Sequence, residues 1–108
     1  SWGFATLNFE LISSAQLWLR LCESRARTEP RDTLPIYRQI ITDTLTVTDK
    51  RNYRSAASIL KTMKAVATGV GHGAAREFDA FLAHTVDANR RRPTCIDAFA
   101  RAGLIPRR

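Results

Sequence analysis

The sequence predicts an all-α fold, with about five helices that pair as antiparallel hairpins. Apolar residues recur every three to four positions along nearly the whole chain, which is the spacing of amphipathic helices. The connections between these segments are short, and proline, glycine or capping residues mark most of them. No alternating segment has a second one nearby with which it could form a sheet. The unequal spacings between segments leave two arrangements open, an open helical solenoid and a compact bundle.

The starts of the second and third predicted helices depend on proline and on short polar side chains. The five predicted helices span residues 7–25, 33–48, 50–68, 74–91 and 94–102. Asp32 or Thr33 is expected to cap the second helix, and Pro35 then lies in its first turn, where a missing N–H costs little. Asp49 is expected to cap the third helix.

The remaining helix ends are predicted at glycine and proline. The glycine-dense segment 69–73 is expected to end the third helix as a turn, and Pro93 to stop the fourth helix. After Pro93, Thr94 and Asp97 have the spacing of a capping box that opens the fifth helix. Gly103 closes that helix, so the next two apolar residues can fold back onto its end.

The helices on either side of residues 49–52 each carry one apolar stripe, which predicts that they face each other as a hairpin. The stripes consist of Leu34, Tyr37, Ile41, Leu45 and Thr48, and of Tyr53, Ala57, Leu60, Met63, Ala67 and Val70. Residues 44–48 alternate and are β-branched, so by themselves they favour a strand. We reject the strand because Leu45 continues the stripe and a lone strand cannot satisfy its backbone. The β-branched run is instead expected to weaken the last helical turn.

Length and composition predict one helical domain covering residues 1–108. Of these residues 44% are hydrophobic and 25% are charged, which is typical of a globular protein. The sequence contains neither a stretch apolar enough to span a membrane nor a visible signal peptide, and we expect a cytoplasmic protein. Because the sequence begins abruptly with Trp2 and Phe4 and without Met, we expect it to be the C-terminal part of a longer protein.

Residue patterns that would indicate catalysis, a cofactor or a metal site are not found in the sequence. The available metal ligands are Cys22, Cys95, His72 and His84, and their spacing is wide and irregular. The two cysteines are expected to be separate reduced thiols, with a disulfide between them as the alternative. The glycines of residues 69–73 resemble a phosphate-binding loop, but such loops follow a strand and the Walker lysine is missing. We therefore expect no enzyme activity.

The net charge of +7, from 17 Lys and Arg against 10 Asp and Glu, raises the question of a nucleic-acid partner. The candidate nucleic-acid-binding residues are Lys50, Arg51, Arg54, Lys61 and Lys64 in the third helix and Arg90, Arg91 and Arg92 after it. A solvated basic face opposite Tyr53 and Leu60 is the commoner explanation, and residues 90–92 can simply complement a helix dipole. Since no aromatic residue is clearly interleaved with these charges, stacking on single strands is not favoured.

Apolar residues near the start of the chain are the candidates for a protein interface. They are Trp2, Phe4, Phe9 and Trp18, beside the broad apolar face that includes Leu17 and Leu21. The alternative is that these aromatic residues close the core. We expect a non-catalytic protein-interaction or scaffolding module whose partner is another protein or a second copy of the chain. Nucleic-acid binding through the third helix is the alternative function.

Two stretches of the sequence resemble the helical region that follows the zinc finger in bacterial SWIM zinc-finger proteins. They are Leu34-Pro35-Ile36-Tyr37-Arg38, and Thr48-Asp49-Lys50-Arg51-Asn52-Tyr53-Arg54 with Ala56, Ala57 and Leu60 after it. The closing stretch, residues 91–104, is similar to the end of many such chains. The resemblance runs from about residue 18 to residue 104.

The resemblance implies a helical, tetratricopeptide-like accessory region of a bacterial cytoplasmic protein, without enzyme activity. The Cys-x-Cys and Cys-x-His ligands that define the SWIM finger are absent from the sequence. The resemblance therefore implies no zinc role for this chain, and any finger would precede it.

Overall fold

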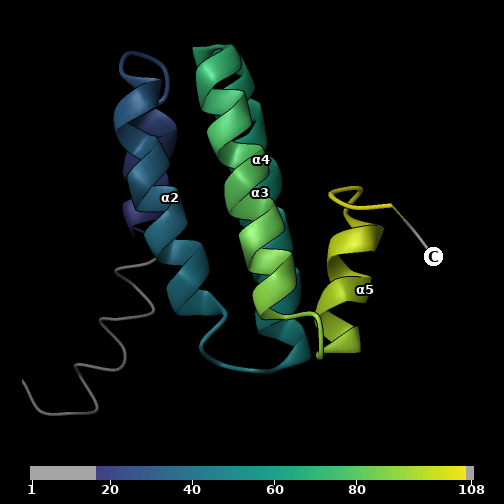
Figure 1. Cartoon of the computed structure of the whole chain (residues 1–108). Coiled ribbons are helices and arrows are strands. Elements are labelled where there is room, and N and C mark those ends of the chain that lie inside the picture. Colours follow the sequence, from purple (N-terminus) through teal and green to yellow (C-terminus); the bar gives the residue numbers. More distant parts are fainter. Residues whose placement is uncertain (1–16, 107–108) are drawn as a thin grey trace, which may run out of the picture.

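The computed structural model describes residues 17–106, and every regular element in this part of the chain is a helix. Residues 17–25 are helical, and four further helices follow: α2 (Pro30–Thr44), α3 (Lys50–Val70), α4 (His72–Ala88) and α5 (Pro93–Arg101) (Figure 1). The predicted all-α class is confirmed, and residues 44–48 do not form a strand. The first part of the first predicted helix, residues 7–16, lies outside the described residues.

Helix α3 is the centre of a helical bundle. It packs against α2, α4 and α5. In Figure 1, α2 and the shorter α5 lie on either side of the pair formed by α3 and α4. The predicted hairpin on either side of residues 49–52 is therefore confirmed, because α2 and α3 are packing neighbours.

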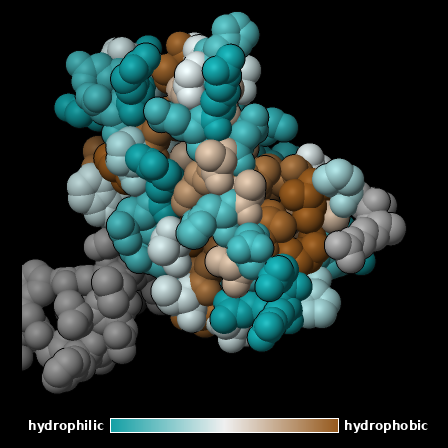
Figure 2. Space-filling view, in the orientation of Figure 1, coloured by the Kyte–Doolittle hydropathy of each residue, from teal (hydrophilic) through white to brown (hydrophobic). Residues whose placement is uncertain are grey.

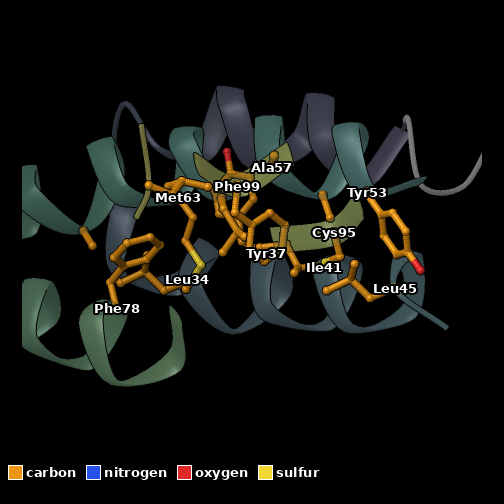
Figure 3. Packing of buried hydrophobic residues seen from close by; sticks show 14 of the residues in the cluster. Leu34, Tyr37, Ile41, Leu45, Tyr53, Ala57, Met63, Phe78, Cys95 and Phe99 are labelled. Atoms are coloured by element: carbon orange, nitrogen blue, oxygen red, sulfur yellow. The ribbon is translucent and has the colours of Figure 1, made fainter. Parts of the chain in front are cut away.

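The core consists of the inward faces of these helices (Figure 3). Its largest fully buried side chains are Tyr37 and Ile41 of α2, Leu60 of α3, Phe78 of α4 and Phe99 of α5. Burying each such side chain contributes roughly 1.5–3 kcal/mol to folding. Leu34 and Leu45 of the first predicted stripe and Met63 and Ala67 of the second are buried in the same cluster.

The start of α2 differs from the prediction. The helix begins at Pro30, whose fixed φ and missing N–H suit the first helical position. Neither of the two residues predicted to cap α2 occupies the capping position, which is that of Glu29. Asp32 lies inside the first turn, and Thr33 is buried with its hydroxyl donating to the Pro30 carbonyl at 2.6 Å. Pro35 therefore lies inside the helix rather than in its first turn. It is exposed, and the burial of Leu34 next to it offsets the lost backbone hydrogen bond.

The junction between α2 and α3 is held by Asn52. Its backbone N–H donates to the Asp49 carboxylate at 2.9 Å, which confirms Asp49 as the cap of α3. Its side-chain Nδ2 donates to the Thr44 carbonyl, also at 2.9 Å. One residue thus ties the end of α2 to the start of α3. Because α2 ends at Thr44, Thr48 lies in the loop and is exposed, and the prediction that it continues the stripe is wrong.

The break between α3 and α4 is shorter than the five-residue turn predicted. Gly71 alone is non-helical, with a φ of 148° that favours glycine, and α4 starts at His72. The other two glycines of the segment lie inside helices. Since both helices extend to Gly71, the connection between them is a tight turn of one residue rather than a flexible linker.

The α4–α5 junction also differs from the prediction. Helix α4 ends at Ala88, and residues 90–92 lie in the following turn rather than in its last helical turn. Pro93 is the first residue of α5. The expected Thr94 cap is wrong, because Arg92 occupies the capping position and its side chain makes no hydrogen bond to the start of the helix. Buried Asn89 fixes this turn by donating to the Thr85 carbonyl at 2.8 Å and accepting from Arg92 at 3.0 Å.

Gly103 ends α5 as predicted. It has a φ of 77°, its N–H donates to the Ala100 carbonyl, and the Leu104 N–H donates to the Phe99 carbonyl. This pair of bonds is the Schellman motif. Leu104 is buried in the same cluster as Phe99, so the chain folds back onto the helix end as the sequence predicts.

Candidate functional site

The candidate site is a basic groove of about 340 Å³ between α3 and α5. Its lining consists of Lys50, Arg54, Ala57, Ser58 and Lys61 of α3 with Thr94, Asp97, Ala98, Arg101 and Ala102. The charged side chains in this lining are four cations and one carboxylate. We call this feature the α3–α5 groove.

The spacing of three basic residues along α3 places them on one face. At 3.6 residues per turn, Lys50, Arg54 and Lys61 lie within about 40° of one another around the helix axis. All three are exposed, and within residues 17–106 none has a carboxylate at ion-pair distance. Buried Ala57 lines the same groove, so the basic face borders the core. The expectation that it lies opposite the core is therefore wrong.

Helix α5 supplies the groove's other two charges. Arg101 and Asp97 are one turn apart and form an ion pair of 2.9 Å at the exposed surface. Arg101 is not among the residues predicted from the sequence, because residue spacing does not reveal that α5 packs against α3. Its only sequence signal is the i, i+4 pairing with Asp97.

The other predicted nucleic-acid-binding residues lie elsewhere. Arg51 and Lys64 are exposed on α3 but do not line the groove. Arg90 lies 3.8 Å from the Asp87 carboxylate, and Arg92 belongs to the α4–α5 turn described above. Arg91 is exposed in that turn. The structure thus gathers three of the eight predicted residues and leaves the remainder dispersed.

The helix of residues 17–25 carries an apolar stripe on its outer face. Leu17, Trp18 and Leu21 are 60%, 49% and 48% exposed, whereas Cys22 of the same helix is buried. Trp18 therefore does not close the core. We call these three residues the outer stripe. The other predicted interface residues, Trp2, Phe4 and Phe9, lie outside the described residues.

A second, more open groove lies between α4 and the C-terminal segment. It is lined by Asp79, Leu82, Ala83, Val86, Asp87, Arg90 and Ile105, and its volume is about 530 Å³. Figure 2 shows apolar surface gathered between α4 and α5. The lining of this groove therefore combines three charged side chains with four aliphatic ones.

The two cysteine thiols of the described residues are buried. Cys22 and Cys95 are both free and both buried. Burial raises the pKa of each thiol above the ordinary value of 9.0, and nearby Arg92 only partly opposes this rise at Cys95. Both therefore stay protonated at neutral pH and have little nucleophilic character.

Metal-ligand clusters and unpaired buried polar atoms are two further possible signs of a site within residues 17–106. No three His, Cys, Asp or Glu side chains come close enough together to hold a metal ion there. The hydroxyl of Tyr37 is buried without a hydrogen-bond partner, and burial is the main cause of its raised pKa. Tyr37 belongs to the core and faces no groove, so it does not mark a site.

Comparisons of the chain with protein-family models, with curated proteins and with solved structures find no match. The resemblance to the region that follows the SWIM finger therefore stays a prediction. Within residues 17–106, none of the helices has the length and apolar character needed to cross a membrane. The two surfaces that could bind a partner are accordingly the α3–α5 groove and the outer stripe.

Proposed function

We propose that this chain is a non-catalytic helical interaction module that binds another protein through the outer stripe. The single observation that supports the proposal is the exposure of Leu17, Trp18 and Leu21 on one helix face. Large apolar side chains that stay half exposed side by side are typical of docking surfaces. Tryptophan in particular is enriched among the residues that dominate binding energy.

The partner that fits this surface is an amphipathic helix with acidic residues beside its apolar face. Leu17 and Leu21 are one turn apart, as in helix-to-helix packing. Exposed Arg25 follows one further turn along, and exposed Arg20 flanks the other side. These arginines favour a partner with Asp or Glu at matching positions. A second copy of the chain would bring arginine toward arginine and fits less well.

The expected binding energy is modest. Covering the exposed halves of three large apolar side chains contributes about 1 kcal/mol each. Charge pairs at the rim of an interface add little affinity but affect the association rate and the choice of partner. The proposal therefore describes a reversible contact of a scaffolding type.

Two further parts of the proposal follow from the resemblance to SWIM-associated regions. The module acts in the cytoplasm of a bacterium, as a tetratricopeptide-like accessory region.

Two model peptides test the proposal. One is a helical peptide with leucines one turn apart and glutamates on both sides of them, and the other has lysine at every glutamate position. We expect the labelled glutamate peptide to bind the full chain in fluorescence anisotropy, and the lysine peptide to bind at least tenfold more weakly.

The matched variants replace apolar residues by serine, either in the outer stripe or at an exposed position elsewhere. Leu17→Ser with Leu21→Ser should abolish binding, whereas Val47→Ser should leave it unchanged. Val47 is the matched control because it is an exposed apolar residue, 53% accessible, in the loop after α2. Equal binding of both peptides, or equal loss in the Val47 variant, would refute the proposed surface. Concentration-dependent self-association lost in the stripe variant would indicate a second copy as the partner.

A further inference from the structure

We infer that the α3–α5 groove binds the sugar–phosphate backbone of a nucleic-acid duplex without reading its sequence. This inference is independent of the proposed protein-interaction function, because it uses a different surface. The observations that carry it are the charges of the groove, their position on α3, and the small side chains between them.

The charges of the groove are unbalanced and largely free. Lys50, Arg54 and Lys61 have no carboxylate partner within residues 17–106, and the only acidic group in the lining, Asp97, is already paired with Arg101. The three free cations are exposed, so they can contact phosphate without a desolvation penalty of the kind buried charges incur.

Two of these cations lie near the start of α3. Lys50 is its first residue and Arg54 follows one turn later; the first turn contains no acidic residue, and the Asp49 carboxylate that caps the helix offsets only part of the positive charge at this end. The N-terminus of a helix has a positive partial charge, so cations there are unfavourable and anions are favourable. Helix α5 begins at Pro93, Thr94 of its first turn lines the groove, and the capping residue Arg92 makes no side-chain hydrogen bond to the start of the helix. An anion bound here would neutralise the free cations and would interact favourably with the positive end of α5.

The extent of the basic face fits a chain of phosphates. Lys50 and Lys61 are eleven residues apart in an α-helix, a separation of about 16 Å along its axis. A duplex carries one phosphate per strand every ~3.4 Å of its axis, so the face spans about five phosphates of one strand. A single small anion would leave most of these charges without a partner.

The small side chains of the groove favour a duplex backbone over the other polyanions. Its uncharged lining residues are Ala57, Ser58, Thr94, Ala98 and Ala102. Because none is aromatic, there is no platform on which unpaired bases could stack. Because the apolar ones are alanines, there is no deep pocket for the anchor residues of an acidic peptide. Hydroxyls and cations remain, and these are the groups that contact phosphate and sugar.

The test is the salt dependence of duplex binding by the full chain. The probe is a fluorescein-labelled duplex of about 20 base pairs and arbitrary sequence, followed by anisotropy. Three phosphate contacts predict a slope of about −2.7 in log affinity against log salt, or a loss of about 40-fold between 50 mM and 200 mM salt. A second duplex of unrelated sequence should bind equally.

Two triple variants locate the site. Lys50→Gln, Arg54→Gln and Lys61→Gln together should flatten the salt slope to nearly zero. The control combines Arg31→Gln, Arg38→Gln and Arg76→Gln, which removes the same charge from exposed positions of α2 and α4 and should keep most of the slope. Glutamine preserves helix propensity. Removing cations from the start of α3 should also keep or raise the melting temperature, so lost binding cannot be ascribed to unfolding.

A single substitution gives an effect of the opposite sign. Asp97→Asn removes the only carboxylate of the groove and frees Arg101, so affinity should rise and the salt slope should steepen by about one unit. Asp79→Asn is the control, because Asp79 lies on the exposed surface of α4 outside this groove. It should change the affinity and the salt slope much less than Asp97→Asn does.

Four results would overturn the inference. The first is a salt slope that both triple variants reduce equally, since binding would then depend on net charge alone. The second is an Asp97→Asn variant with lower affinity. The third is tighter binding of a single strand than of the duplex, which would indicate base stacking. The fourth is displacement of the duplex by an equally charged glutamate peptide at similar concentration, which would indicate an acidic protein.

Discussion

The central position of α3 predicts that a substitution at Leu60 costs more stability than one anywhere on the helix surface. Leu60 is fully buried in the helix that contacts α2, α4 and α5. Leu→Ala at a buried site costs about 2.7–5 kcal/mol, through lost transfer free energy and the cavity left behind. A chain of 108 residues has a total stability of roughly 5–15 kcal/mol. The Leu60→Ala variant should therefore lose between about a fifth and all of its stability.

Urea denaturation followed by far-ultraviolet circular dichroism measures this loss. The midpoint should fall with an unchanged m-value, because the surface exposed on unfolding stays almost the same. Ser55→Ala is the matched control on the same helix, since Ser55 is exposed and the change should stay within about 0.5 kcal/mol. A Leu60→Ala loss below about 1 kcal/mol would refute the packing described around α3.

Four further predictions concern stability. Asn52→Ala should cost about 1–2 kcal/mol in urea denaturation, because the Thr44 carbonyl loses its 2.9 Å donor and keeps only the 3.4 Å hydrogen bond from the Val47 N–H; an unchanged midpoint would contradict the junction. Gly103→Ala should cost about 1–2 kcal/mol for placing a side chain at φ 77°, although open space surrounds it, and thermal melting tests this. Tyr37→Phe should stabilise the fold by about 1 kcal/mol, since it removes a buried hydroxyl without a partner; a loss above that value would reveal a hydrogen bond there. Burial raises the pKa of Cys22 and Cys95 above 9.0, so their contribution to stability is fully present below pH 9.0 and is lost as pH rises through the folded-state pKa. An increase in the urea midpoint as the pH is raised above 9.0 would contradict this.

The helices themselves could be predicted because each carries one continuous apolar stripe. The stripe that includes Tyr37 and Ile41 and the stripe that includes Leu60 are both buried, and the α2–α3 hairpin follows from them. Asp49 was also predictable, because a short acceptor immediately before a periodic segment has few roles other than capping.

Two of the errors in helix starts have a common cause. Pro30 and Pro93 each occupy the first position of a helix, whereas the predictions placed the starts three residues and one residue later, at polar capping residues. A proline already satisfies the first-turn geometry, so Thr33 and Thr94 were not needed as caps. Pro35 within α2 shows that tertiary packing can outweigh a local rule against proline inside helices.

The candidate groove could be predicted only in part. The helical spacing of Lys50, Arg54 and Lys61 placed them on one face, which was visible in the sequence. The arrival of α5 beside that face was not visible, because it depends on how Phe99 and Leu104 enter the core rather than on any periodicity. Arg101 and Asp97 were missed for this reason.

The two surfaces assign different tasks to different parts of the bundle. The outer stripe lies on the helix of residues 17–25, and the α3–α5 groove is formed by two helices later in the chain. A variant that loses peptide binding should therefore keep its duplex binding, and the reverse should also hold. Loss of both activities in the stripe variant would mean that the two surfaces are not independent.

The most direct measurement of the proposed function is an amide chemical-shift map of the isotopically labelled full chain during titration with the glutamate-flanked helical peptide. The proposal predicts that the largest shifts fall within residues 17–25 and that the residues lining the α3–α5 groove change little. Shifts centred on the groove of Leu82, Val86 and Ile105, or no shifts at a peptide concentration that saturates the anisotropy signal, would contradict the assignment of the outer stripe as the docking surface.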